Sequence, residues 1–225
     1  MKAKSKRYKK EAQQVGKEAL SLEAAVDRVK SFTSVKFDQT VECVLHLGID
    51  PKQADQLIRG SLSLPHGVGK QKRVIAFCSD ADVEVAKKAG AIEAGTDELI
   101  QKITDGWLDF DVAVASPKVM GKAGKLGRIL GPQGKMPSPK NGTVTDDVAT
   151  AVAEFTAGKI EFRNDSGGNV HAVVGKQSFE KKKLMENIEA FVSHIRKIKP
   201  SSAKGTYIKK ACLAATMSPG VAVSI

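Results

Sequence analysis

The stretch VIAFCSDADVEVAKKAG at residues 74–90 decides the fold of the middle of the chain. Its first residues, Val74–Cys78, form a continuous apolar run, which is typical of a strand buried on both faces. Asp80 and Asp82 then open a segment that predicts a helix ending at Gly90. A buried strand followed directly by a helix is the building unit of a parallel sheet that helices cover.

The segment that follows repeats this alternation of strands and helices. A second buried strand is predicted at Asp111–Ala115, and Gly106 and Gly158 end the helices on either side of it. This order predicts a three-layer, Rossmann-like α/β domain, which we assign to residues 68–159. The predicted strands are 74–78, 91–94 and 111–115. The predicted helices are 80–88, 96–106, 119–130 and 145–158, with Thr96 as the cap of the second.

The two ends of the chain show a different pattern. Apolar residues from Leu22 to Phe32 fall at helical spacing, with Ser21 as the N-cap. Alternation over Val41–Leu47 predicts a half-buried strand, and Ser178 is the predicted cap of a long second helix. The predicted strands are 41–47, 61–64, 160–163, 170–174, 207–215 and 221–225, and the predicted helices are 22–32 and 178–200.

These terminal segments together predict one discontinuous, two-layer α+β domain built from residues 1–67 and 160–225. The α/β domain is inserted into it, so the chain crosses between the two domains twice. Gly67, Gly69 and Gly158 lie near these crossings and predict a hinge that lets one domain move against the other. We interpret residues 1–17, which are basic and lack apolar periodicity, as a flexible arm that becomes ordered on RNA.

The positive charge is concentrated in the discontinuous domain. The chain has 36 Lys and Arg against 25 Asp and Glu, a net charge of +11. Residues 68–159 hold 13 basic and 12 acidic residues, so the terminal segments carry a net +10. A polyanion such as nucleic acid is therefore expected to bind the discontinuous domain. The alternative is a solvated basic surface that serves solubility.

The sequence lacks the usual patterns of catalytic and metal-binding sites. The three cysteines (Cys43, Cys78 and Cys212) have no CxxC spacing, and the four histidines form no HxxxH or HExxH pair. P-loop, GxGxxG and GxSxG motifs are missing as well. We expect no enzymatic activity, no metal and no cofactor. No apolar run is long enough to span a membrane, and the start of the chain does not resemble a secretory signal. Because the cysteines indicate no disulfide framework, we expect a protein of the reducing cytoplasm.

The most distinctive stretch is MGKAGKLGRILGPQGKMPSPKNGTV at residues 120–144, which holds six glycines, three prolines and five basic residues. It lies within a longer segment, Val112–Thr145, that has no acidic residue. The stretch is either a basic surface loop stiffened by proline or a loop that contacts phosphates. The basic residues of the longer segment are Lys118, Lys122, Lys125, Arg128, Lys135 and Lys140.

The part LGRILGPQGKMPSPKNGTV at 126–144 closely resembles the diagnostic motif of the bacterial ribosomal protein L-one family, the mobile stalk protein of the large subunit. Further segments resemble the same family in the same order, so the resemblance covers nearly the whole chain. They are KFDQTVECVLHLGID at 36–50, RGSLSLPHGVGK at 59–70, RNDSGGNVHAVVGK at 163–176 and KGTYIKKACLAATMSPGV at 204–221.

This resemblance implies the architecture described above and a structural protein of the 50S subunit that binds large-subunit (23S) rRNA through the discontinuous domain. It also implies a role in release of E-site tRNA and repression of the protein's own operon through its mRNA. We expect a monomer when the protein is free. By motif, the family's RNA contacts fall on Lys36, Phe37, Thr40, Glu42, Asp165, His171, Thr216, Met217 and Ser218, the last standing where the family usually has glycine.

These residue types suit recognition of a folded RNA by its shape and backbone. Lys36 can neutralise a phosphate, and the hydroxyls of Thr40 and Thr216 can bind 2′-hydroxyls. Phe37 offers an apolar face, with a place in the core as the alternative. Glu42 fits as an acceptor for a 2′-hydroxyl or base amine, or as an ion-pair partner that orders a lysine. The chain has 8 Phe, 2 Tyr and 1 Trp, so broad base stacking is not expected.

Three other functions remain as alternatives at this point. An RNA-processing or RNA-modifying enzyme would need a nucleophile, metal or cofactor motif. A DNA-binding architectural protein would prefer duplex DNA to structured RNA. A regulator with the same fold would not associate with large subunits.

Overall fold

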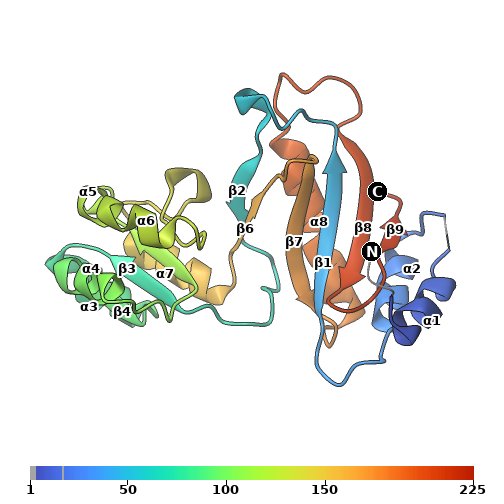
Figure 1. Cartoon of the computed structure of the whole chain (residues 1–225), viewed down its shortest axis with the longest axis horizontal. Coiled ribbons are helices and arrows are strands. Elements are labelled where there is room, and N and C mark those ends of the chain that lie inside the picture. The colour runs from blue at the N-terminus through green and yellow to red at the C-terminus, as the bar shows by residue number, and fades with distance from the viewer. Residues whose placement is uncertain (1–3, 17) are drawn as a thin grey trace. The chain divides into compact units, whose positions relative to one another are not determined.

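The structure is a computed structural model that describes residues 4–16 and 18–225. Its residues form two compact units (Figure 1). Unit 1 contains the described residues up to Gly69 together with Ile160–Ile225, and unit 2 is Lys70–Lys159. The chain thus enters unit 2 and returns to unit 1, as an inserted domain requires.

Unit 1 is built on an antiparallel sheet in which the strands follow the order β7-β1-β8-β9. The central strand β1 pairs with both β7 and β8, and a bulge between Val41 and Glu42 shifts its register against β7. Gly175 lies in this irregular part of β7 with a φ of +151°. The strands are β1 (Thr40–Leu47), β7 (Asn169–Lys176), β8 (Ile208–Ala215) and β9 (Val221–Val223).

Two helices, α2 (Leu22–Lys30) and α8 (Lys181–Lys197), cover one face of this sheet and form the core with it. The predicted cap of α2 is confirmed, since Ser21 Oγ accepts the Ala24 N–H. The predicted cap of α8 is wrong: Glu180 holds the N-cap position, and Ser178 instead donates its N–H and its hydroxyl to the carboxylate of Asp38.

The N-terminal segment contains a helix, α1 (Lys6–Gln14), where the sequence predicted a flexible arm. The prediction is wrong for these residues and cannot be judged for residues 1–3 and 17, which lie outside the described part. Ser5 Oγ accepts the Tyr8 N–H at the start of α1, and the buried Glu11 accepts a hydrogen bond from Ser34. Contacts of this kind stabilise a helix that apolar periodicity did not reveal.

A two-stranded antiparallel ribbon of β2 (Arg59–Leu62) and β6 (Ile160–Arg163) belongs to unit 1 as well. The bounds of β6 are those predicted, whereas β2 begins two residues before the predicted strand. Phe162 anchors the ribbon, because its ring packs edge-on against Phe191 of α8 with centroids 6.0 Å apart. A short 3-10 helix, η1 (Ala54–Gln56), precedes the ribbon.

Unit 2 contains a parallel sheet with the strand order β4-β3-β5. Every residue of β3 and β5 is buried, which explains why both strands are apolar throughout. The predicted parallel sheet is therefore confirmed. Its strands are β3 (Val74–Phe77), β4 (Glu93–Gly95) and β5 (Val112–Ala115).

Helices cover both faces of the parallel sheet, as separate hydrophobic clusters on its two sides show. The helices α3 (Val83–Lys88) and α7 (Val148–Ala157) cover one face, and α4 (Asp97–Thr104), α5 (Met120–Ala123) and α6 (Gly127–Leu130) the other. Short 3-10 helices occur at η2 (Asp80–Asp82), η3 (Gly124–Leu126) and η4 (Pro139–Asn141). The fold class predicted from the sequence, a two-layer α+β part with an inserted three-layer α/β part, is confirmed.

Two local predictions for unit 2 need correction. The basic helix expected at 119–130 consists of α5, η3 and α6, a break that glycines within it favour. Thr96 does not cap α4 with its side chain; its hydroxyl donates to the carbonyl of Cys78 at the end of β3. Among the described residues, no helix has both the length and the apolar character that a membrane crossing requires.

Candidate nucleic-acid interface

The face of the unit 1 sheet opposite α2 and α8 is open, and it carries several of the predicted site residues. Along β1, Val41, Cys43, Leu45 and Leu47 are buried, whereas Thr40, Glu42, Val44 and His46 are only half-buried. Successive side chains of a strand point to opposite faces, so the second set lies on the open face. Burial raises the pKa of the Cys43 thiol to about 12, which keeps it protonated and unreactive.

Thr40 and Thr216 are joined where β1 begins and β8 ends. The Thr40 N–H donates to Thr216 Oγ1 at 3.1 Å, and the Thr216 N–H donates to the Thr40 carbonyl oxygen at 3.1 Å. Lys176 at the end of β7 adds its ammonium group, which donates to Thr40 Oγ1 at 2.8 Å. Three strands therefore meet at Thr40.

Met217 is fixed to this end of the sheet through Gln39. The side chain of Gln39 is 1% exposed, and its Oε1 accepts the Met217 N–H at 2.9 Å. Its Nε2 donates to the Phe32 carbonyl oxygen and to Gln177 Oε1, both at 3.1 Å. This buried amide holds the backbone of Met217 while the methionine side chain remains in solvent.

Lys36 and Phe37 precede β1 in a loop that lies at the same end of the sheet. Lys36 is exposed, Phe37 is 51% exposed and Met217 is 45% exposed. The alternative that Phe37 lies in the core is therefore wrong. The loop is held beyond Phe37 by Asp38, whose carboxylate accepts both bonds from Ser178.

Ser218 closes the turn after Met217. Its hydroxyl accepts the Ala215 N–H at 2.9 Å and also lies within hydrogen-bonding distance of the Ala215 and Pro219 carbonyl oxygens. Gly220 follows this turn. A Cβ at Gly220 would lie 2.7 Å from Cys212 Sγ, so this position needs glycine. We call Lys36, Phe37, Thr40, Thr216, Met217 and Ser218 together the Thr40–Thr216 surface.

Glu42 lies on the open face next to this surface, between Val173 of β7 and Ala214 of β8. Within residues 4–16 and 18–225, no side chain forms an ion pair or hydrogen bond with its carboxylate. The interpretation of Glu42 as an ion-pair partner of a lysine thus finds no support in the structure. Its oxygens are available as acceptors for a hydroxyl or an amine.

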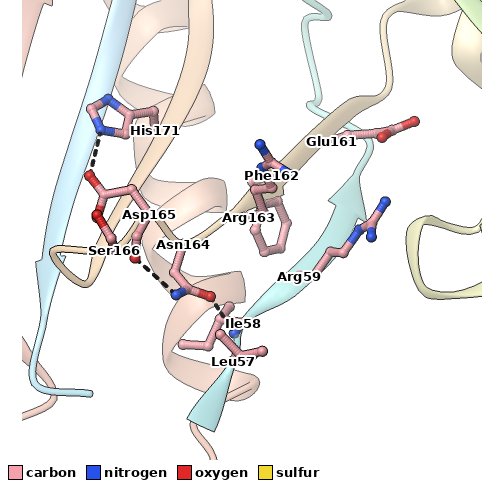
Figure 2. Close-up of a pocket in the computed structure, with 10 residues that line it drawn as sticks. All are labelled: Leu57, Ile58, Arg59, Glu161, Phe162, Arg163, Asn164, Asp165, Ser166 and His171. Atoms are coloured by element: carbon pink, nitrogen blue, oxygen red, sulfur yellow. Dashed lines mark hydrogen bonds and ion pairs between the residues drawn. The ribbon is translucent and has the colours of Figure 1, made fainter. Parts of the chain in front are cut away.

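Asp165 and His171 lie away from the Thr40–Thr216 surface. His171 is opposite Val44, four residues along β1 from Thr40, or about 13 Å at the usual rise of a strand. Asp165 lies in the turn between β6 and β7 (Figure 2), where it accepts the N–H groups of Gly167 and Asn169 and the Asn169 side-chain amide. His171 Nε2 lies 3.7 Å from Asp165 Oδ2.

The hydrogen bonds from Asn169, and next that from the Gly167 N–H, lower the pKa of Asp165 to about 2. The Asp165 carboxylate thus already accepts three hydrogen bonds within its own turn. Its structural effect is to fix the turn and to place a negative charge beside His171, which is exposed on the open face.

Two residues that hold the Thr40–Thr216 surface together, Gln39 and Lys176, were not predicted from the sequence. Gln39 is uncharged and surrounded by polar residues, so nothing in the local pattern indicated burial. Lys176 follows a glycine at the end of a strand and had no distinguishing spacing. Pairing of distant strands, which the sequence does not display, brings both to the site.

In unit 2, the predicted basic segment is partly neutralised. Lys122 forms an ion pair with Asp97 at 2.8 Å, and the Lys135 ammonium group donates to the Leu108 carbonyl oxygen while lying over the ring of Phe110. Lys118, Lys125, Arg128 and Lys140 are exposed. Among the residues that the structure describes, no cluster of His, Cys, Asp and Glu could hold a metal ion.

An inserted α/β unit, an open-faced antiparallel sheet and an exposed surface at one end of that sheet together define a class of two-unit proteins built around a discontinuous α+β part. Residues 29–219 match the profile of the ribosomal protein L1p/L10e family. The chain therefore belongs to the ribosomal protein L1p/L10e family.

Individual relatives agree with this assignment over almost their whole length. The large ribosomal subunit protein uL1 of Thermobifida fusca is 52% identical over 97% of this chain and 94% of its own. The protein of the same name from Rhodopirellula baltica is 56% identical over 98% of both chains. The one from Beutenbergia cavernae is 51% identical over 98% of this chain and 93% of its own.

Proposed function

We propose that unit 1 binds large-subunit rRNA directly, through the Thr40–Thr216 surface and the adjoining open face of the sheet. The observation that carries this proposal is the joining of Thr40 to Thr216, which brings exposed side chains from two distant segments to one end of the sheet. As a member of a family of large-subunit ribosomal proteins, the chain works in the cytoplasm as part of the 50S subunit.

The chemistry of the surface suits a folded RNA. Lys36 supplies a positive charge for phosphate, and Thr40 and Glu42 supply groups that bind 2′-hydroxyls. Phe37 and Met217 offer apolar area for a ribose or a single base. Unit 1 also carries 23 basic and 13 acidic residues, counted over the sequence, which attracts a polyanion from a distance.

Binding of a large-subunit rRNA fragment over a range of salt concentrations tests this proposal. If about 6–10 phosphates are neutralised, affinity falls about 10³–10⁵-fold between 50 and 200 mM salt. A double variant, Phe37→Ala/Met217→Ala, removes two exposed side chains that do not support the core, and we expect weaker binding with unchanged thermal stability. A flat salt response, or full affinity of this variant, contradicts the proposal.

Unit 2 is proposed to be the part that moves, as the mobile stalk that takes part in release of E-site tRNA. Gly67, Gly69 and Gly158 have φ values of 59°, 75° and 110°, which favour glycine, and they lie at or next to the bounds of the units. We propose that they form the hinge. Fluorescence energy transfer between labels at Ser63 and Lys140 measures this motion; a single fixed transfer efficiency, unchanged by Gly67→Ala, contradicts it.

We further propose that the chain represses translation of its own operon by binding an mRNA structure that mimics the rRNA site. The prediction is competition: the leader mRNA and the rRNA fragment displace each other from unit 1. Simultaneous binding of both contradicts this part of the proposal.

We propose no catalytic function and a monomeric state for the free protein. Sedimentation of the free protein tests the monomeric state. Incubation of the purified protein with rRNA tests the alternative of a processing or modifying enzyme, which requires turnover of the RNA.

A further inference from the structure

The β2–β6 ribbon places two arginines directly opposite each other. Arg59 and Arg163 are partners in its antiparallel register, and both are exposed. Residues paired in this way project to the same side of the ribbon, while Phe162, one position earlier, packs on α8 from the other side. Like charges directly opposite each other disfavour strand pairing.

The two arginines line a hollow of about 710 Å³ in unit 1 (Figure 2). The hollow extends from Arg59 past Arg163 to Asp165 and His171, and Leu57, which is 53% exposed, forms part of its wall. Because His171 lies on the open face of the sheet, the hollow continues the surface proposed above to bind RNA.

The wall of the hollow is held rigidly by Asn164. Its Oδ1 accepts the Ile58 N–H at 2.8 Å, and its own N–H donates to the Ile58 carbonyl oxygen at 2.9 Å. This double link fixes the residue before Arg59 to the residue after Arg163. The arginine pair therefore stands on backbone that needs no rearrangement to receive a ligand.

The charged residues of the hollow differ in the contacts that they already make. Asp165 uses its oxygens on Asn169, Gly167 and His171, and Glu161 and Arg59 each make an interaction within the chain. In the described residues, the guanidinium group of Arg163 has no hydrogen-bond or ion-pair partner. Arginine presents a fork of donors that matches the oxygens of a phosphate group.

We propose that Arg59 and Arg163 form a second RNA site of unit 1, which takes a phosphodiester group of the same folded RNA that the Thr40–Thr216 surface binds. The inference rests on the proposed function and extends it along the sheet by one site. Leu57 gives the neighbouring ribose an apolar surface, and His171 lies between the two sites.

The test compares charge-matched double variants in binding a large-subunit rRNA fragment across a salt series. For Arg59→Gln/Arg163→Gln we expect affinity to fall about 10- to 100-fold, with the slope of log affinity against log salt reduced by about 1–2. The control, Lys182→Gln/Arg196→Gln, removes the same charge from exposed positions of α8, which covers the other face of the sheet. It is expected to keep a slope close to that of the wild type.

Two further measurements separate a binding role from a structural one. Arg59→Lys/Arg163→Lys keeps the charges and should restore most of the salt slope while leaving affinity below wild type, because the fork of donors is lost. Arg163→Gln alone should leave the thermal midpoint unchanged or higher, since it removes a like-charge pair. A clear drop in that midpoint, or a wild-type salt slope in the double Gln variant, overturns the proposal.

Further comparisons distinguish an RNA phosphate from free phosphate. They also separate a failure of this inference from a failure of the proposed function. Inorganic phosphate alone, titrated to millimolar concentration, should produce no saturable shift of the arginine Nε–H resonances; saturable binding with an unchanged RNA slope would assign a small-anion site instead. If Phe37→Ala/Met217→Ala weakens binding while the double Gln variant does not, only this inference fails. If the wild type itself does not bind the RNA, both proposals fail.

Discussion

The hydroxyl group of Thr216 bridges the backbone of Thr40. Thr216 Oγ1 accepts the Thr40 N–H at 3.1 Å and lies 3.3 Å from the Thr40 carbonyl oxygen, to which it donates. The two residues are 176 positions apart in the sequence. A side chain that joins two strands at the edge of the proposed interface affects both the stability of the sheet and the shape of the surface.

Replacing Thr216 with valine removes this bridge while keeping the shape of the side chain. We expect the free energy of unfolding to fall by about 0.5–1.5 kcal/mol, because the Thr40 N–H loses its partner. RNA affinity should fall as well. Urea denaturation and rRNA binding measure the two effects. The control Thr206→Val, at an exposed position, should change neither; equal effects of both variants would refute the bridging role.

Gln39→Leu tests the support of Met217. The variant leaves the Met217 N–H without its acceptor inside the protein, at a side chain that is almost fully buried. We expect a loss of about 1–3 kcal/mol in the free energy of unfolding and weaker RNA binding under conditions where the protein is still folded. The exposed Gln133→Leu serves as control. Unchanged RNA affinity in folded Gln39→Leu would show that Met217 needs no support.

The lowered pKa of Asp165 should make the stability of the protein depend on pH in acid. Its folded-state pKa of about 2 lies below the ordinary value of 3.8, because Asn169 and Gly167 donate hydrogen bonds to the carboxylate. In acid the unfolded state therefore takes up the proton first. The stabilisation by Asp165 is complete above the ordinary pKa and is lost as the pH falls toward 2.

The measurement is the difference in thermal midpoint between the wild type and Asp165→Asn as a function of pH. We expect the wild type to be more stable at neutral pH and the difference to shrink on acidification. A difference that stays constant down to the lowest pH at which both proteins fold would contradict the assigned role of the carboxylate.

Gly175→Ala tests the packing of α8 on the irregular part of β7. A Cβ at this position would lie 2.9 Å from both Leu184 Cδ2 and Phe179 Cδ2, and the φ of +151° disfavours any side chain. We expect a loss of about 1–3 kcal/mol in the free energy of unfolding. Gly205→Ala, with a φ of +77° and nothing within 4 Å, measures backbone strain alone and should cost less. Equal costs would mean that crowding is unimportant.

The sequence predicted the elements whose stability comes from an apolar pattern. The buried strands at Val74 and Val112 and the alternating strand at Val41 were found because their burial is visible residue by residue. The helix at Lys6 was missed because it depends on contacts such as Glu11 with Ser34, which lie 23 positions apart. Ser178 fits an N-cap pattern but is bound by Asp38, 140 positions away.

The proposed site, too, could be predicted from the sequence only in part. Exposure of Lys36, Phe37 and Met217 agrees with the predicted interface, but the proximity of the two segments depends on strand register, which no local pattern contains. The use of Asp165 within its own turn was open to prediction, since the sequence Asp-Ser-Gly-Gly-Asn at 165–169 is typical of a turn capped by a side chain. The arginine pair became visible only once β2 and β6 were aligned.

The discontinuity of unit 1 has a consequence for how the protein is made. Unit 2 is contiguous in sequence, so its sheet can form early during synthesis, whereas β1 must await β7 and β8; His46 and its partner Asn169 are 123 positions apart. Before β8 has been translated, a nascent chain has no Thr216 to join to Thr40. A stalled or truncated polypeptide therefore lacks the complete surface that we propose to bind rRNA.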